Sequence, residues 1–347
     1  MHDLNCGRSR KCSYQNTAPN RYFNASRQVL LPSPFSLILA AVSLSISATS
    51  ATAQSITSLA KEDNPDFRAP AMRYRLVQEQ LEPSYITVLG GGGNIERLFF
   101  EANVAPHFGA GWPKLALVLT SKIVLRMRND STHSAPIRTP SYMPRITLYW
   151  WGPFRGTSTR SDFLSFTISH HSNGQAGPFY VTNTTTPNTF DGSFSTNFLE
   201  LDYHRVFQLG DNHGVGWLKA GVRVHVPVNE DAELRSSTGD NQYGRYRLLL
   251  STLSRRPLPL LPRIPVVLQF DYFYILDGRF QGHRFFSADR LGASGTFNVA
   301  LRTEALLGFF VNGYVGQDYY NIWYKQRLKV LRVGFSVQSI TSFRSPE

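Results

Sequence analysis

Two histidines and a serine end a short apolar run in the stretch "ISHHSNGQAG", residues 168–177. If the segment is a strand, side chains alternate between two faces, so His170 and Ser172 share one face. On one face they are close enough for the imidazole to take the hydroxyl proton. The stretch therefore indicates a serine nucleophile with its base. The alternative is a hairpin turn, because Asn173-Gly174 is a strong hairpin signal.

A histidine base needs a third group that fixes its tautomer and ring orientation. The next candidate strand, "SFSTNFLELDYHR", places Asn197 on its apolar face, across the hairpin from His170. Its amide oxygen can accept the imidazole N–H, and a neutral amide costs less near hydrocarbon than a carboxylate. We therefore expect Ser172, His170 and Asn197 to act together. The alternative for Asn197 is a turn residue that begins a strand, and His171 is expected to be structural.

The first 53 residues have the features of a secretory signal peptide. Five Lys and Arg residues precede the apolar stretch "FSLILAAVSLSIS", which is too short to span a bilayer. The triplet 51–53, Ala-Thr-Ala, fits the small-x-small cleavage rule and predicts a mature chain that starts at Gln54. We expect residues 54–80 to form a polar, exposed lead-in. The alternatives are a periplasmic plug and an amphipathic segment. Residues 81–347 would form the main domain.

Both cysteines, Cys6 and Cys12, lie in this leader, which excludes a disulfide scaffold and a cysteine-ligated metal site in the mature chain. Without the leader, 31 Lys and Arg stand against 23 Asp and Glu. An exported cationic chain meets the acidic lipids of the cell envelope. We therefore interpret the charge as an envelope feature and expect no nucleic-acid partner.

After residue 54, no apolar run approaches the length of a membrane helix. Alternation with a period of two recurs instead, as in "GWLKAGVRVHV", where Leu218 and Val222 oppose Lys219 and Arg223. Aromatic clusters such as "YWW" and "DYYNIWY" suit the interfacial girdles of a membrane barrel. The sequence predicts an all-β fold, a transmembrane antiparallel β-barrel of about twelve strands. A soluble β-sandwich gives the same alternation and is the alternative.

The candidate strands are 84–89, 95–104, 114–126, 145–151, 160–172, 195–207, 215–226, 243–253, 264–275, 295–303, 306–314 and 328–337. An even number is what closure of a single-chain bacterial barrel requires. A barrel of this size is narrow, and charged side chains would largely fill it. Those expected inside are Glu200, Asp202, Lys219, Arg223, Asp271, Arg302 and Glu304. We therefore expect no wide pore.

The motif "HHSNG" with the later "STN", together with "SAPIRTPSYMP" and "YKQRLKVLRVGFSV", resembles the outer-membrane phospholipase A family of Gram-negative bacteria. The resemblance extends from about residue 84 to 337. It implies hydrolysis of the acyl esters of membrane phospholipids, at the A1 or A2 position, on the lipid-facing side of a barrel in the outer membrane. Ser172 would be the nucleophile, His170 the base and Asn197 the orienting residue. The Gly174 amide would donate to the oxyanion.

The resemblance also implies calcium dependence and a homodimer. Carried over by position, the calcium ligands would be the Gln175 carbonyl, the Ser193 hydroxyl and Ser134 of the partner subunit, which are oxygen ligands of the kind calcium prefers. The loop from Gly174 to Asn197 is longer than the family pattern and carries the polar run "FYVTNTTTPNTFDG".

Two other functions are consistent with these residues. Small lipid A deacylase barrels also carry a His-x-Ser-Asn pair on the outer face, but they are shorter and use a glutamate. A structural or pore-forming barrel with a vestigial triad is the non-enzymatic alternative.

Overall fold

The computed structural model describes residues 66–129, 137, 139–152, 154, 156–210, 214–226, 242–258, 261–278, 280–302, 307–337 and 340–344. The predicted signal peptide, Ser134 and Glu304 lie outside these residues, as does the Arg302 side chain. Within the described residues, no helix is long and apolar enough to cross a membrane.

One helix, two short 3-10 helices and a continuous series of strands make up the described chain. Their bounds are α2 Pro70–Gln80, β1 Ser84–Thr87, β2 Gly92–Gly93, β3 Leu98–Val104, β4 His107–Trp112, β5 Leu115–Arg128, β6 Ser141–Trp150, β7 Arg160–Ser172, β8 Ser195–Leu209, β9 Gly214–Val226, β10 Tyr246–Leu258, β11 Leu261–Ile275, η1 Ala288–Arg290, β12 Leu291–Arg302, β13 Leu307–Gln317, η2 Asn321–Lys325, β14 Arg327–Val337 and β15 Ile340–Arg344.

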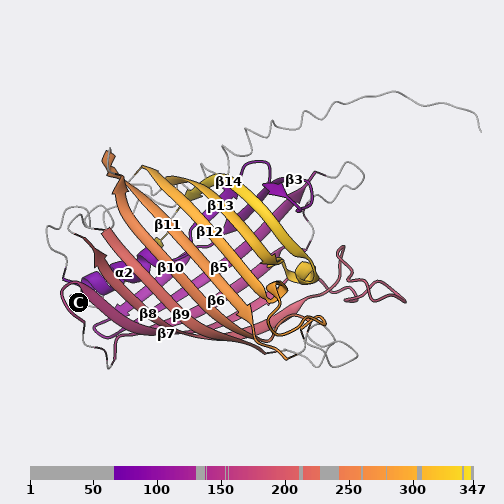
Figure 1. Ribbon diagram of the computed structural model, residues 1–347, viewed down its shortest axis with the longest axis horizontal. Helices are drawn as coiled ribbons and strands as arrows, with labels where there is room; N and C mark the ends of the chain where they lie inside the picture. Colours follow the sequence, from indigo (N-terminus) through magenta and orange to yellow (C-terminus); the bar gives the residue numbers. More distant parts are fainter. Residues whose placement is uncertain are drawn as a thin grey trace, which may run out of the picture. The chain divides into compact units, whose positions relative to one another are not determined.

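The strands form a closed antiparallel transmembrane barrel with twelve strand positions, as the sequence predicts (Figure 1). The ring closes where β1 pairs with β14. β3 and β4 are two parts of one wall strand, since both pair with β5, and Pro106 separates them because proline has no N–H for the ladder. β1 and β2 likewise share β14. β15 adds a short parallel pairing to β4.

The two ends of the barrel differ in their connections. By the strand bounds, β4 and β5 are separated by two residues, β8 and β9 by four and β10 and β11 by two at one end, whereas β5 and β6, β7 and β8, and β9 and β10 are separated by 12 to 22 residues at the other. Membrane barrels of bacteria have short periplasmic turns and long extracellular loops. The end of the barrel where β7 stops and β8 starts is therefore the extracellular end.

Helix α2 packs inside the ring, against the periplasmic half of the wall (Figure 1). Pro70 occupies the first turn, where its missing N–H is not needed, and residues that favour helices follow. The cluster it forms with the wall contains Phe67, Met72, Tyr74, Leu76, Val77, Leu81, Ala116, Val118, Tyr149, Trp151, Phe163, Val206, Val215 and Trp217. The described part of the lead-in is thus buried rather than exposed, because its apolar side chains find an apolar patch inside the barrel. The boundaries of the signal peptide (1–53), the lead-in (54–80) and the main domain (81–347) stay predictions.

A second apolar cluster lies among the extracellular loops. It joins Phe179 and Phe194 of the β7–β8 connection to Tyr243, Ile322 and Tyr324. These residues come from three different connections, so the cluster holds the long loop 173–194 against η2.

Candidate active site

The candidate site lies on the lipid-facing wall, where β7 and β8 pair. Along β7, side chains such as Thr167 are buried, while their neighbours face outward, and Ile168 is 53% exposed. His170 and Ser172 continue the outward row of β7, and Asn197 belongs to the outward row of β8. All three polar side chains therefore share the outward surface, next to exposed apolar residues such as Ile168 and Leu199.

His170 and Asn197 face each other across the two strands. They are opposed in register, and Nδ1 of His170 lies 2.8 Å from Oδ1 of Asn197. An amide oxygen only accepts, so Nδ1 carries the proton in this pair and Nε2 is left as a base. Ser172 lies two residues farther along the same face, in register with Tyr142 of β6 and Ser195 of β8. His170, Ser172 and Asn197 are each partly buried.

Asn173 fixes the chain immediately after this serine. Its side chain is fully buried, and Nδ2 donates to the Gly192 carbonyl at 2.8 Å. Oδ1 accepts from the backbone N–H groups of Gln175, at 3.2 Å, and Phe194, at 3.0 Å. The Asn-Gly pair thus begins the long loop 173–194 and does not form a two-residue hairpin. The Asn173 side chain joins the two ends of this loop.

Gly174, the expected oxyanion donor, is exposed and has φ +65°, in the left-handed region that glycine adopts without strain. A Cβ atom at this position would lie 3.3 Å from Cε2 of Tyr142. Tyr142 is 40% exposed and opposes Ser172, so its ring flanks both the serine and the glycine. From the sequence, Asn173 is expected only as part of a hairpin turn, and no role is expected for Tyr142. The Asn-Gly pair was a signal for Asn173, whereas only the register of β6 against β7 identifies Tyr142.

A buried polar chain supports the inner side of the same strand end. Nε2 of His171 lies 3.2 Å from Oγ of Ser141, which also accepts from Nδ2 of Asn321 at 2.9 Å. These three residues are at most 4% exposed. They connect β7, β6 and η2 directly behind the candidate site, which agrees with a structural role for His171.

The expected calcium ligands lie at the two ends of the long loop. Gln175 is held by Asn173, and the Ser193 N–H donates to the Gly177 carbonyl at 2.9 Å. Nowhere in the described part of the chain do three or more His, Cys, Asp or Glu residues form a group that could hold a metal ion. Calcium is also bound by carbonyl and hydroxyl oxygens, so the donor types at Gln175 and Ser193 suit this ion.

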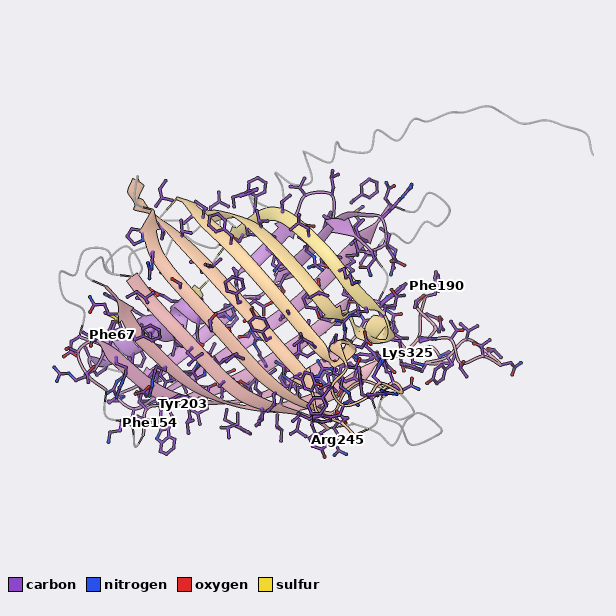
Figure 2. All side chains as sticks on the ribbon, in the orientation of Figure 1. Phe67, Phe154, Phe190, Tyr203, Arg245 and Lys325 are labelled. Atoms are coloured by element: carbon purple, nitrogen blue, oxygen red, sulfur yellow. The ribbon has the colours of Figure 1, made fainter. Side chains whose placement is uncertain are left out.

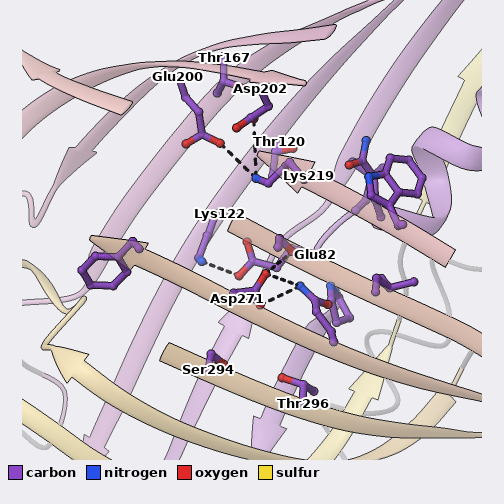
Figure 3. A pocket seen from close by; sticks show the side chains of 18 of the residues that line it. Glu82, Thr120, Lys122, Thr167, Glu200, Asp202, Lys219, Asp271, Ser294 and Thr296 are labelled. Atoms are coloured by element: carbon purple, nitrogen blue, oxygen red, sulfur yellow. Dashed lines mark hydrogen bonds and ion pairs between the residues drawn. The ribbon is translucent and has the colours of Figure 1, made fainter. Parts of the chain in front are cut away.

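The charged side chains inside the barrel pair with each other (Figure 3). Glu200 accepts from Lys219 at 3.3 Å and forms an ion pair with Arg223 at 2.5 Å. Such pairing is what makes burial of these charges tolerable. They line an interior cavity of about 490 Å³, and among the residues described here His170, Ser172 and Asn197 do not line it. The interior and the candidate site are therefore on opposite sides of the wall.

Glu82, which precedes β1, lies in the same interior. Lys122 contacts it at 2.5 Å and Arg145 at 3.2 Å. Burial by itself would raise the pKa of Glu82, but the two cations outweigh burial and lower the pKa to about 2.

The fold defines a transmembrane β-barrel, and its outer wall carries a candidate hydrolase site. The structure is similar to outer-membrane phospholipase A from Escherichia coli, with 14% identity, a TM-score of 0.50, and coverage of 74% of this chain and 93% of that chain. It is also similar to a Salmonella typhi outer-membrane phospholipase dimer with bound calcium, with 15% identity, a TM-score of 0.49, and coverage of 83% and 98%. At this identity the likeness concerns the fold. No protein-family model and no curated protein matches the sequence.

Proposed function

We propose that this chain is an outer-membrane phospholipase A, which hydrolyses acyl esters of phospholipids taken laterally from the bilayer. The observation that carries the proposal is the hydrogen bond between His170 and Asn197, beside Ser172, on the lipid-facing wall. On a lipid-facing wall, apolar residues would stabilise the barrel better than a serine, a histidine and an amide. A structural role therefore does not explain these three polar residues.

In the proposed reaction, the Ser172 hydroxyl attacks the ester carbonyl and Nε2 of His170 takes its proton. Asn197 holds the imidazole through Nδ1 and keeps Nε2 directed to the serine. The tetrahedral oxyanion accepts a hydrogen bond from the Gly174 amide. His170 then protonates the departing glycerol oxygen. This leaves an acyl ester on Ser172. Water attacks its carbonyl while His170 takes a proton from the water. The Ser172 oxygen then leaves, takes that proton from His170, and the fatty acid is released.

Calcium and a second copy of the chain belong to the same proposal. Gln175 and Ser193, with Ser134 of the partner subunit, would hold the ion. Bound there, calcium would supply positive charge for the oxyanion. A homodimer would bring the outward apolar rows of two barrels together and form a cleft for the acyl chains. We further propose export by the predicted signal peptide and residence in the outer membrane.

The test is hydrolysis of a detergent-dispersed phospholipid by the refolded mature chain, with calcium or with a chelator. We expect calcium-stimulated release of fatty acid. Ser172→Ala should reduce the rate to background, and Asn197→Ala should reduce kcat by roughly tenfold or more, because the imidazole loses its orienting partner.

Ser254→Ala is the matched control, because Ser254 also lies on the outward face of a strand, β10, away from the site. It should behave as the wild type. Equal release by the wild type and Ser172→Ala would exclude the proposed nucleophile. Ion conductance without hydrolysis would favour the pore alternative.

A further inference from the structure

A second polar cluster lies on the lipid-facing wall of the same two strands, at the periplasmic end. Asp162 belongs to the outward row of β7, and its register partner Arg205 and Tyr203 belong to the outward row of β8. Arg160 completes the cluster. Figure 2 shows Tyr203 beside Phe154 at this end, far from the loop that follows the candidate active site.

The carboxylate of Asp162 organises the cluster. Asp162 is 6% exposed, and its Oδ1 accepts from the Tyr203 hydroxyl and from Nε of Arg205, both at 2.8 Å. Nε of Arg160 lies 3.0 Å from Oδ2, and Nη2 of Arg205 donates to the Tyr203 hydroxyl at 2.9 Å. The two arginine side chains stay 44% and 45% exposed. One buried carboxylate thus fixes two half-exposed guanidinium groups, with one positive charge in excess.

Unused donors remain on both arginines. In the part of the chain that the structure describes, Nη1 of Arg205 and both Nη groups of Arg160 have no protein acceptor. Arg68 lies near Gly156 in the β6–β7 connection, but it pairs with Asp66 at 2.8 Å, so the two together add no net charge. A guanidinium fork with free N–H groups matches the oxygens of a phosphate.

The position of the cluster indicates where such a phosphate would be. Asp162 lies eight residues before His170 on β7, which corresponds to about 27 Å along the strand and about 20 Å across a bilayer at a usual tilt. Between the two levels the outward residues are apolar, with Phe166 41% and Leu201 48% exposed. An apolar band of this kind is about 25 Å tall in membrane barrels. The cluster therefore lies at the headgroup level of the periplasmic leaflet.

We propose that Arg160 and Arg205 bind the phosphodiester of an anionic phospholipid in the periplasmic leaflet, with Asp162 and Tyr203 orienting the guanidinium groups. An arginine that only reaches toward water does not have to be oriented. A phosphate site needs its guanidinium groups held in fixed positions, and the buried carboxylate of Asp162 does this. The single excess positive charge favours a headgroup of charge −1, such as phosphatidylglycerol, over zwitterionic phosphatidylcholine. The acyl chains would lie along the apolar rows of β7 and β8.

Native mass spectrometry of the refolded mature chain tests this site, with ether-linked phosphatidylglycerol and ether-linked phosphatidylcholine as probes. An esterase cannot cleave ether lipids, so the result does not depend on the proposed hydrolysis. We expect preferential retention of phosphatidylglycerol, and an apparent affinity about fivefold lower in Arg205→Gln, which is the size expected for loss of a partly exposed ion pair. Arg256→Gln, which removes an exposed cation on β10, should match the wild type.

Folding of each variant is checked by its heat-modifiable migration on gels, and Arg160→Gln provides a second substitution at the site. The proposal fails if both cluster variants retain as much phosphatidylglycerol as Arg256→Gln. It also fails if inorganic phosphate displaces the lipid, because the site would then bind a free anion.

Discussion

Asn173 stands between the candidate nucleophile and the amide expected to stabilise the oxyanion. A catalytic donor must be held close to its productive position, since small displacements weaken its contact with developing charge. The three hydrogen bonds of the buried Asn173 side chain fix the backbone on both sides of Gly174 and join it to Phe194. In the proposed reaction, Asn173 is a positioning residue.

Replacing Asn173 with alanine would leave the Gly192 carbonyl and two amide groups without their partner, at a cost of about 1–3 kcal/mol in stability. We expect kcat to fall by roughly tenfold with little change in KM, because substrate binding does not involve this side chain. The calcium concentration for half-maximal activity should rise, since Asn173 also holds Gln175. Initial rates against substrate and calcium measure both effects.

Asn188→Ala is the control for the loop, because the Asn188 side chain makes similar turn contacts with Phe190 and Asp191 but has no hydrogen bond to Gln175 or Phe194 in the described part of the chain. It should lower stability without changing kcat or the calcium response. If Asn173→Ala kept the wild-type kcat and calcium response, Asn173 would only anchor the loop and would not be a positioning residue for the reaction.

Helix α2 is the element that gives the barrel an apolar interior at its periplasmic end. Leu76 and Val77 are fully buried against the wall. Polar contacts add to this packing: Arg255 pairs with Glu79 at 3.0 Å, and Arg73 donates to the Pro113 carbonyl at 2.7 Å. The helix therefore fills space that wall side chains alone leave open.

Leu76→Ala should lower the free energy of unfolding by about 3 kcal/mol, because it removes a fully buried side chain and leaves a cavity. Urea unfolding in micelles measures this, with tryptophan fluorescence as the signal. Trp151 and Trp217 lie in the same cluster and report on it directly. Ala71→Ser, at an exposed position of the helix, should change little. A loss below about 1 kcal/mol would show that α2 does not pack tightly in solution.

At the scale of the whole molecule, ion pairs across the interior join parts of the chain that are far apart in sequence. Arg126 pairs with Glu101 at 2.9 Å and with Asp318 at 2.8 Å, linking β5, β3 and the β13–β14 loop. Glu82 joins the entry to β1 with Lys122 of β5 and Arg145 of β6. Folding of the barrel brings these charges together, so its stability depends on their ionisation.

Glu82 gives this dependence a direction. Its pKa is about 2 in the folded chain, below its ordinary value near 4.5. The folded state therefore binds its proton less readily, and the stabilisation is complete above pH 4.5 and is lost as the pH falls toward 2. We expect a loss of about 2 kcal/mol over this range, discounted for partial exposure.

The measurement compares urea unfolding of the wild type and Glu82→Gln at pH 6 and pH 3. The variant should be less stable at pH 6 and should lose less on acidification. If the two proteins lost equal stability between these pH values, Glu82 would not be a source of the pH dependence.

The sequence predicts the wall well because alternation is a local property. Candidate strands 160–172 and 215–226 agree closely with β7 and β9. The sequence pattern does not predict the start of β6 at Ser141, because Pro144 interrupts the alternation. β12 begins at Leu291, earlier than expected, because Gly295 weakens its apolar row. β4 was missed because Pro106 separates it from β3.

Residue types and spacing by themselves determined the barrel class, the face of each strand and the shared face of His170 and Ser172. Only the tertiary structure decided which residues meet across strands, because a shift of one residue in register turns every side chain to the opposite face. The sequence predicts that Asn197 faces His170, and the observed register gives that pairing, whereas the pairing of Arg205 with Asp162 was found only in the structure. The inward packing of α2 and the anchoring of the long loop by Asn173 likewise depend on contacts between distant segments, which no local pattern encodes.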